Sequence, residues 1–285
     1  MKPAPFAYAR ADTLDEALAL LAEHGDNARI ISGGQSLMAT LNMRLSAPAV
    51  LVDISRIEGL SGIHDAGNRL KIGAMTRHVD VEKSSLIATT TPLIKKAMGH
   101  VAHPAIRNRG TFGGSIAFAD PAAELPACAV ALRATMHVVG KDGEREVDSE
   151  AFFKGLYETA IETGEILTAV SVPKIEEGWK SGFMELARRR GDYAIIGLAV
   201  HAEYDGATFG EARLVFFNSG DKPTTVPRTT TLLEGQSWSE NLADRLAASL
   251  KEELDPPEDL NADSAMRKHL AGVLTKRVLQ KIAGE

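Results

Sequence analysis

Two glycine pairs in this chain stand among residues that donate hydrogen bonds. The first pair lies in residues 30–38 (IISGGQSLM), and the second in residues 107–128 (RNRGTFGGSIAFADPAAELPAC). Glycine allows left-handed backbone angles and lets the main chain approach a ligand closely. The free N–H groups of such turns bind anions, phosphate groups above all. We therefore expect two loops that converge on one extended polyanionic ligand.

The side chains beside these glycines add donors but little positive charge. Ser32, Gln35 and Ser36 accompany the first pair, and Thr111 and Ser115 accompany the second. We expect the first pair to lie between a short strand and the start of a helix, where the helix dipole adds to the N–H groups. This lining favours a bridging diphosphate in a partly enclosed site.

A carboxylate follows the second glycine pair at a defined place. The pair itself is predicted to form a turn inside a strand-like run, and Asp120-Pro121 then predicts the opening of a helix. Glu124 falls in the first turn of that helix. Because a carboxylate accepts hydrogen bonds from hydroxyl groups, we assign Glu124 to a ribose hydroxyl of the ligand.

Other reactive residue types have simpler explanations. His100 and His103 are predicted to be structural, because neither stands near an obvious nucleophile. Cys128 lies in an Ala- and Leu-rich helix, which is typical of a buried, inert thiol. The run at residues 188–193 (RRRGDY) is either a solvated loop or an active-site edge whose Tyr193 packs on a ring.

Composition and missing motifs exclude several classes of function. The chain has no HExxH, GxSxG, GxxxxGK[ST] or GxGxxG motif, so zinc-protease, hydrolase, P-loop and Rossmann functions lose their usual support. A net charge of −6 argues against nucleic acid and anionic membrane as partners. We see no signal peptide and no membrane span, and a single cysteine, so we expect a cytoplasmic protein without a cysteine-built metal cluster.

Three segments of different hydrophobic pattern must position these residues. Residues 1–57 predict a small α/β unit, residues 58–177 a central α/β domain, and residues 178–285 a sheet followed by helices. In the first unit we expect a helix at residues 13–24, capped by Thr13. The strands expected in the three segments are at residues 29–31, 50–54, 69–74, 135–139, 145–147, 165–173, 182–186, 195–203 and 211–218.

The motifs ISGGQSL, RNRGTFGGSIAFADPAAELPA, GEILTAVSVP and RRRGDYA, in this order, resemble the FAD-binding medium subunit of molybdenum hydroxylases. That family includes the medium subunits of carbon monoxide dehydrogenase and quinoline 2-oxidoreductase and the FAD domain of xanthine dehydrogenase. The resemblance covers essentially the whole chain. It implies an α+β, FAD-binding fold of the vanillyl-alcohol oxidase/molybdenum hydroxylase type. Two α/β domains would enclose FAD, followed by a C-terminal three-stranded antiparallel sheet with a helical bundle.

The resemblance also implies which residues contact FAD. Residues 32–36 and 111–115 would meet the diphosphate, Glu124 the adenosine portion, and Tyr193 the isoalloxazine, while Leu167 would lie in a strand that borders the cofactor. The complete set expected to bind FAD is Ser32, Gly33, Gly34, Gln35, Ser36, Leu37, Thr111, Phe112, Gly113, Gly114, Ser115, Glu124, Leu167 and Tyr193. We expect no catalytic residue and no metal ligand on this chain.

The role implied by the resemblance is electron transfer. A large partner subunit would carry the molybdenum–molybdopterin cofactor, and a small one two [2Fe–2S] clusters, in a dimer of heterotrimers. FAD on this chain would pass electrons to an external acceptor. Gln35 stands where some relatives have histidine. Met184 stands where xanthine dehydrogenases have lysine, so we expect an acceptor other than NAD.

Two other functions stay open at this stage. A stand-alone flavin oxidase of the same fold would need a substrate pocket and a base on this chain, and no residue is a clear candidate for either. A non-catalytic nucleotide-binding or assembly subunit would need only the two glycine loops. Purification with or without flavin, molybdenum and iron distinguishes the three.

Overall fold

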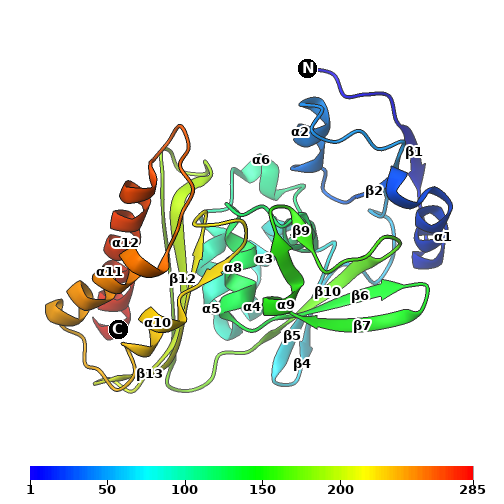
Figure 1. Ribbon diagram of the computed structural model, residues 1–285. Helices are drawn as coiled ribbons and strands as arrows, with labels where there is room; N and C mark the ends of the chain where they lie inside the picture. Colours follow the sequence, from blue (N-terminus) through cyan, green and yellow to red (C-terminus); the bar gives the residue numbers. More distant parts are fainter. Residues whose placement is uncertain (285) are drawn as a thin grey trace.

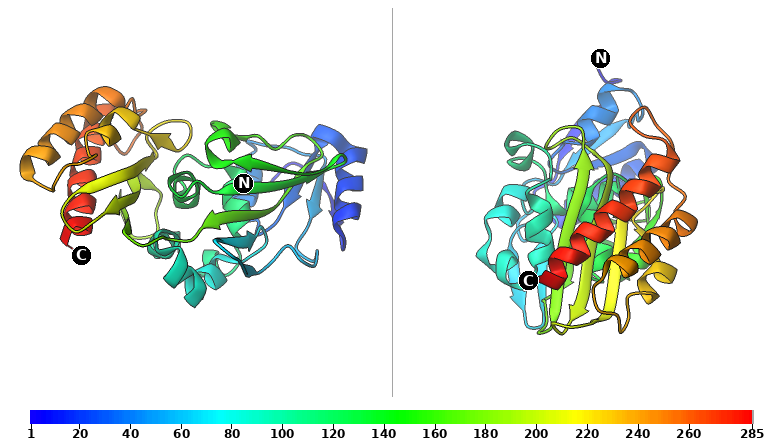
Figure 2. Two further views of the ribbon diagram at one scale, coloured as in Figure 1. Left: turned by 90° about the horizontal axis from the view of Figure 1, so that it is seen from below. Right: turned by 90° about the vertical axis from the view of Figure 1, so that its left-hand side faces the viewer.

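The computed structural model describes residues 1–284, in which three parts follow one another along a long axis (Figure 1). The N-terminal part and the C-terminal helices lie at opposite ends, and the central sheet lies between them (Figures 1 and 2). The boundaries expected at residues 57 and 177 remain predictions, but each of the three larger sheets lies within one expected segment. No helix within residues 1–284 is both long enough and apolar enough to cross a bilayer.

The N-terminal part is a three-stranded parallel sheet in the order β1-β3-β2. Its elements are β1 (Ala7–Arg10), α1 (Leu14–His24), a 3-10 turn (Gly25–Asn27), β2 (Ala28–Ile31), α2 (Leu37–Asn42) and β3 (Val50–Asp53). The Thr13 hydroxyl accepts from Glu16 N at 3.2 Å and so begins α1, as expected. Strand β1 was not predicted, because most of its side chains are exposed and show no hydrophobic pattern.

The central part is a five-stranded antiparallel sheet in the order β4-β5-β10-β6-β7. Its strands are β4 (Ile63–Ala66), β5 (Arg69–Gly73), β6 (Thr135–Gly140), β7 (Gly143–Asp148) and β10 (Ile166–Pro173), and a separate small ladder joins β8 (Phe153–Gly155) to β9 (Glu158–Thr159). The helices of this part are α3 (His78–Lys83), α4 (Ser85–Thr90), α5 (Pro92–Met98), α6 (Pro104–Arg107), α7 (Phe112–Phe118), α8 (Glu124–Ala131) and α9 (Ser149–Phe152).

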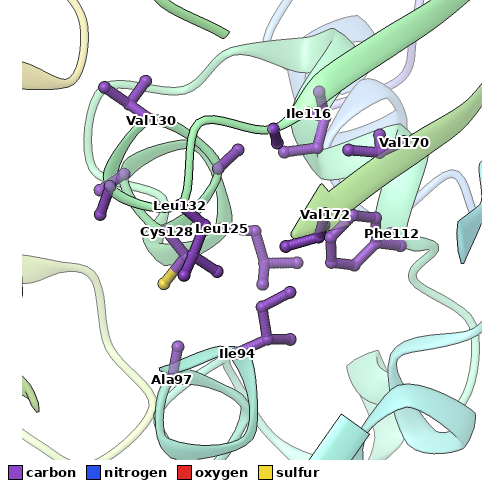
Figure 3. Close-up of a cluster of buried hydrophobic side chains, with 14 of the residues drawn as sticks. Ile94, Ala97, Phe112, Ile116, Leu125, Cys128, Val130, Leu132, Val170 and Val172 are labelled. Carbon is purple, nitrogen blue, oxygen red and sulfur yellow. The ribbon is translucent and has the colours of Figure 1, made fainter. Parts of the chain in front are cut away.

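A core of apolar side chains fills the space between this sheet and its helices (Figure 3). Side chains from α5, α7 and α8 meet Val170 and Val172 of β10 there. Cys128 is among them and fully buried, as expected, and burial raises the pKa of its thiol well above the usual value. The sulfur is therefore a packing group.

The C-terminal sheet has four strands, in the order β11-β12-β13-β14, where three were expected. The additional strand, β14 (Thr224–Thr225), pairs with Val215 and Phe216, and two residues are too few to carry a readable pattern. The other elements are β11 (Trp179–Ala187), β12 (Ala194–Tyr204), β13 (Phe209–Phe217), α10 (Pro227–Thr231), α11 (Glu240–Glu253) and α12 (Ser264–Gly284).

This sheet is buried on both faces: one face packs against the central part and the other against the C-terminal helices. Ala199, Val215 and Phe217 belong to the central core, whereas Leu198, Leu214 and their neighbours pack against the C-terminal helices. Helix α12 lies across the strands on the outer face (Figure 2, right).

The stretch at residues 107–128 differs from its prediction. The second glycine pair lies inside helix α7 and not in a turn within a strand. Thr111 begins that helix, because its hydroxyl accepts from Gly114 N at 3.1 Å. Helix α8 starts at Glu124, after a turn in which Asp120 Oδ1 accepts from Ala122 N at 2.9 Å.

Candidate functional site

The two glycine loops touch each other, as the sequence predicts. Ser32 Oγ and Thr111 Oγ1 lie 3.1 Å apart and share a hydrogen bond. Gly33 packs directly on the other main chain: a Cβ built there would contact Arg109 O and lie 2.9 Å from Gly110 Cα. Only glycine fits so close an approach, so the contact between the loops depends on Gly33.

Several main-chain N–H groups of the first loop have no hydrogen-bond partner in the described part of the chain. It leaves β2 at the carboxyl end of the parallel sheet, where ligands of such sheets bind. The N–H groups of residues 33–36 have no hydrogen-bond partner within residues 1–284. Gly34 takes a left-handed φ of 71°, and Gln35 Nε2 donates to Gly33 O at 3.1 Å, which holds the turn open. A row of free N–H groups suits an anion such as a diphosphate.

The second loop has no such row, which corrects the expectation that its N–H groups face a ligand. The N–H groups of Phe112, Gly113, Gly114 and Ser115 donate, in that order, to Thr76 O at 2.9 Å, Ala74 O at 2.9 Å, Thr111 Oγ1 at 3.1 Å and Thr111 O at 3.1 Å. All four donors at the start of α7 are thus satisfied by the protein itself. The partly exposed hydroxyl of Ser115 has no partner within residues 1–284 and remains available.

Gly113 and Gly114 serve different contacts. A Cβ on Gly113 would lie 2.5 Å from Ala74 Cα, so this residue lets α7 pack on the chain that leaves β5. A Cβ on Gly114 would lie 2.5 Å from Thr111 Oγ1 and 2.7 Å from Ser32 Oγ. Gly114 therefore leaves room for the hydroxyl pair that joins the two loops.

His78 lies behind the second loop and carries no charge toward it. Its main-chain N–H donates to Gly110 O at 2.9 Å, and its side chain is buried. Burial, together with the charges of the nearby Arg107 and Arg77, lowers the pKa of His78 to about 4. The imidazole is neutral at pH 7 and supports the loop by packing.

A second group of polar residues lies at the other end of α7. The helix has seven residues and spans about 10 Å, so a ligand lying along it would reach from Thr111 to this group. Asp120 lies near Tyr193 and Tyr157, and its charge raises the pKa of both hydroxyl groups. Phe118 packs edge-on against Tyr157, with ring centroids 5.2 Å apart.

The tyrosines of this group present flat, exposed rings. Tyr193 is 66% exposed and Tyr157 is 54% exposed, which is unusual for rings beside a polar cluster. Loss of hydration at the hydroxyl, with the charge of Asp120, raises the pKa of Tyr193. Tyr193 therefore stays protonated at neutral pH.

Glu124 is partly buried at the start of α8. Loss of hydration, together with the charges of Glu185 and Asp120, raises its pKa to about 8. At neutral pH the carboxyl group is largely protonated, so it can donate as well as accept a hydrogen bond. Its assignment to a ribose hydroxyl remains a prediction.

Two of the expected ligand residues point into the protein. The side chains of Leu167 and Phe112 belong to the central core, and Leu167 stands at an irregularity in the pairing of β10 with β6. Neither side chain lines an open surface, so any contact with a ligand would come from the main chain. Leu37, by contrast, is partly exposed at the start of α2.

The residues at 100–103 and 188–190 have structural surroundings. His100 Nδ1 lies 3.2 Å from Glu185 Oε1, which fits the structural role expected for it. His103 lies against Gly191, in the loop that carries Tyr193. The three arginines of residues 188–190 are exposed and make no ion pair within residues 1–284.

Sequence analysis left out Asp120, Tyr157 and Thr76 as site residues. Asp120 had been assigned only to a helix start, although an Asp that follows the second glycine helix was a visible signal. Tyr157 has a left-handed φ of 55° in a loop with no motif. Thr76 acts through its carbonyl group, which no side-chain pattern reveals.

Comparison with known proteins gives the family context. Residues 4–175 match the family described as "FAD binding domain in molybdopterin dehydrogenase", and residues 181–282 match "CO dehydrogenase flavoprotein C-terminal domain". The alpha subunit of the 6-hydroxypseudooxynicotine dehydrogenase complex of Paenarthrobacter nicotinovorans is 36% identical, over 99% of this chain and 95% of that protein.

Two further relatives agree with this match. The carbon monoxide dehydrogenase medium chain of Hydrogenophaga pseudoflava is 34% identical, over 98% of this chain and 97% of that one. A chain of the quinoline 2-oxidoreductase structure from Pseudomonas putida 86 superimposes with a TM-score of 0.94 at 36% identity, covering 100% of this chain and 99% of that chain.

Proposed function

This chain belongs to the family of FAD-binding medium subunits of molybdenum hydroxylases, which are oxidoreductase subunits, and we propose that it holds FAD across its two glycine loops and relays electrons. The observation that carries the proposal is the row of free N–H groups at residues 33–36, in contact with the second loop through Ser32 and Thr111. Such a row fits the diphosphate of FAD.

The first loop supplies most of the contacts to the diphosphate in this proposal. Ser32 and Ser36 add hydroxyl groups to the N–H row, and the Ser36 side chain makes no capping hydrogen bond with α2. The second loop holds Ser32 in place through Thr111 and offers the Ser115 hydroxyl. The complete set proposed to contact FAD is that expected from the sequence, with Asp120 and Tyr157 added and with main-chain contacts only from Leu167 and Phe112.

The far end of α7 would receive the other parts of the cofactor. Tyr193 offers an exposed ring to the isoalloxazine, and the charge of Asp120 lies near its hydroxyl. Glu124 would meet the adenosine portion as a largely protonated carboxyl. When bound, FAD supplies a centre that takes up and releases electrons one or two at a time.

In this proposal, the electrons come from the iron–sulfur clusters of a partner subunit and pass from the flavin to an external acceptor. We propose a large subunit with the molybdenum–molybdopterin cofactor, a small subunit with two [2Fe–2S] clusters, and a dimer of heterotrimers. The names of the relatives, which include "complex subunit alpha" and "medium chain", support a complex of several subunits. This chain has one cysteine, and it is buried, whereas each cluster needs four ligands. Its own residues hold and orient the flavin, and an external acceptor other than NAD collects the electrons.

Purification from the native source tests the proposal. We expect a yellow chain with a flavin absorption band, together with two further subunits, molybdenum and iron. A chain that binds flavin and oxidises a small substrate unaided would contradict the relay. A chain without flavin would contradict FAD binding.

Two kinetic measurements test the proposed role of Tyr193 and the proposed electron acceptor. Tyr193→Ala should leave FAD content unchanged but alter the rate of flavin reoxidation, and Tyr8→Ala, an exposed tyrosine of β1, should alter neither. Reoxidation by NAD at the rate of turnover, followed by stopped flow, would refute an acceptor other than NAD.

A further inference from the structure

Asn218 joins three segments that lie far apart in the sequence. It directly follows β13, where its N–H donates to Pro121 O at 2.7 Å. Its side-chain Nδ2 donates to Ala194 O at 2.6 Å and to Ile195 O at 3.3 Å. Its φ of 52° is left-handed, a region that asparagine tolerates better than most residues. Asn218 therefore fixes two other main chains at once.

Arg267 of α12 holds Asn218 from the other side. Its Nη1 donates to Asn218 O at 2.7 Å, and its Nη2 lies 2.6 Å from Asp259 Oδ2. The Arg267 side chain is 1% exposed, and a buried guanidinium is stable only when hydrogen bonds and a counter-charge compensate its lost hydration. The three groups thus form a rigid anchor.

The two segments that Asn218 holds are the direct neighbours of Asp120 and Tyr193. Pro121 directly follows Asp120, and Ala194 directly follows Tyr193. A shift of either segment would therefore change the separation between the tyrosine hydroxyl and the Asp120 carboxylate. The anchor thus controls a separation that it does not itself span.

The loop at residues 188–193 joins β11 to β12, whose pairing of Ala187 with Ala194 holds its two ends, and Gly191 supports its middle. Gly191, with a φ of 85°, lies so close to residues 102–103 that a Cβ there would be 2.8 Å from His103 Nδ1 and 2.9 Å from Ala102 O. Between the two supports, the arginines of residues 188–190 are exposed. The order of this loop thus depends on the contacts at Gly191, on the strand pairing of Ala187 with Ala194, and on the bond from Asn218 to Ala194.

We propose that Asn218, held by Arg267, is a positioning residue that fixes the loop of residues 188–193 and sets Tyr193 against Asp120. Where Tyr193 meets the flavin, the anchor fixes the distance between its ring and the cofactor; this part rests on the proposed function. The ordering of the loop does not, since it involves only this chain.

Limited proteolysis of the FAD-free full chain tests the anchor directly. Trypsin cleaves after arginine, and residues 188–190 offer three exposed sites in the loop. Asn218→Gly keeps the left-handed φ but removes both side-chain hydrogen bonds, so cleavage there should be roughly tenfold faster, in proportion to local opening. Asn218→Asp should have the same effect, because a carboxylate would face the carbonyl oxygens of Ala194 and Ile195.

Asn68→Gly is the matched control, since Asn68 is exposed between β4 and β5 and its side chain makes no hydrogen bond within residues 1–284. It should leave the cleavage rate unchanged. Thermal melting of each variant separates local opening from global unfolding. Wild-type cleavage rates in both Asn218 variants, with unchanged melting, would overturn the proposal.

The fluorescence lifetime of bound flavin tests the second part. A nearby tyrosine ring quenches flavin emission, so Tyr193→Leu and Asn218→Gly should both lengthen the lifetime while FAD content stays the same. A lengthened lifetime in Tyr193→Leu alone would overturn the role of the anchor at the flavin. A wild-type chain without flavin would instead refute the proposed function and leave the proteolysis result standing.

Discussion

The first glycine loop leaves the N–H groups of residues 33–36 without partners in the described chain, whereas the second satisfies all four N–H groups at the start of α7. The two loops have similar residues, Ser and Thr beside a Gly-Gly pair, and they lie in contact. The difference teaches that a glycine pair can serve a ligand or serve packing. The role of the pair depends on whether a neighbouring segment supplies acceptors for its main-chain N–H groups.

The glycines themselves divide in the same way. Gly33 permits contact between the loops and Gly34 a left-handed turn, whereas Gly113 permits packing of α7 on Ala74. Gly114 is intermediate, because it lies in the second loop and faces the hydroxyl of Ser32 in the first. Substitutions at these positions should therefore separate FAD retention from stability.

Among the substitutions, the largest effect is expected for Gly33→Ala. The new Cβ would meet main-chain atoms of Arg109 and Gly110, which cannot rotate away. We expect a loss of about 3 kcal/mol in the free energy of unfolding and no FAD in the purified chain. Urea unfolding of the FAD-free chain and the flavin-to-protein ratio measure the two effects.

Gly34→Ala is the matched control for that prediction. Its Cβ would meet only side-chain atoms of Ile31 and Met38, at 3.4 Å and beyond, so the cost is the left-handed φ, about 1 kcal/mol. Equal effects of the two substitutions would show that the contact between the loops is unimportant.

A second prediction concerns the pH dependence of stability, which should come from Glu124 at the start of α8 and not from the first loop. The pKa of Glu124 is about 8 when folded and near 4.5 when unfolded, so the folded chain binds more protons between these values. The contribution of Glu124 to stability should therefore be full below pH 4.5 and fall by about 4 kcal/mol as the pH rises to 8.

Glu124→Gln removes this titrating group and should flatten that part of the pH profile. Urea midpoints of the FAD-free chain at several pH values measure it. Glu23→Gln, an exposed carboxyl group on α1, should leave the profile as in the wild type. A wild-type slope in Glu124→Gln would mean that the carboxyl group is hydrated and charged.

The third prediction compares the two glycines of the second loop. Gly114→Val should displace the Ser32–Thr111 hydroxyl pair and reduce FAD retention at least tenfold, at a stability cost of about 2 kcal/mol. Gly113→Ala should reduce stability by a similar amount, yet the folded fraction should bind FAD normally, as measured by titration of the apoprotein. FAD retained in full by Gly114→Val would remove the second loop from the cofactor site.

The smallest effect is expected for the hydroxyl pair itself. In a double-mutant cycle with Ser32→Ala and Thr111→Ala, the coupling free energy should be about 1 kcal/mol, in line with one hydrogen bond at 3.1 Å. Thr111→Ala should cost about 1 kcal/mol more on its own, because it also removes the N-cap of α7. Thr111→Ser keeps the hydroxyl, so it should retain most of the coupling free energy with Ser32 and most of the stability from the N-cap of α7. A coupling of zero would make the two loops independent.

Much of the fold follows from local sequence. Thr13 marks the start of α1, and the Lys141-Asp142-Gly143 turn marks the hairpin of β6 and β7. The family and the α+β fold inferred from the motifs are confirmed by the matches over residues 4–175 and 181–282 and by the similar structures. The strands that were missed have two to four residues each, too few for a clear hydrophobic pattern; they are β1, β4, β8, β9 and β14.

The site was less predictable, for a physical reason. The sequence predicts that the two glycine loops lie together. It does not reveal that the N–H groups of Phe112 and Gly113 are already hydrogen-bonded, because their acceptors belong to another segment, at Thr76 and Ala74. Likewise, the carboxylate near Tyr193 belongs to Asp120, in a distant turn. Such pairings arise from tertiary packing and leave no mark in local sequence.

The hydrogen bonds behind the second loop also set the order in which the chain can fold. Gly113 N donates to Ala74 O, and Ala74 N donates to Thr168 O at 2.8 Å. Strand β10, which contains Thr168, lies between β5 and β6 in the central sheet although it follows both in sequence. During synthesis, the second loop therefore lacks its final support until β10 has left the ribosome, whereas the sheet behind the first loop is complete once β3 has emerged. Flavin capture thus waits for a strand that is made well after both glycine pairs.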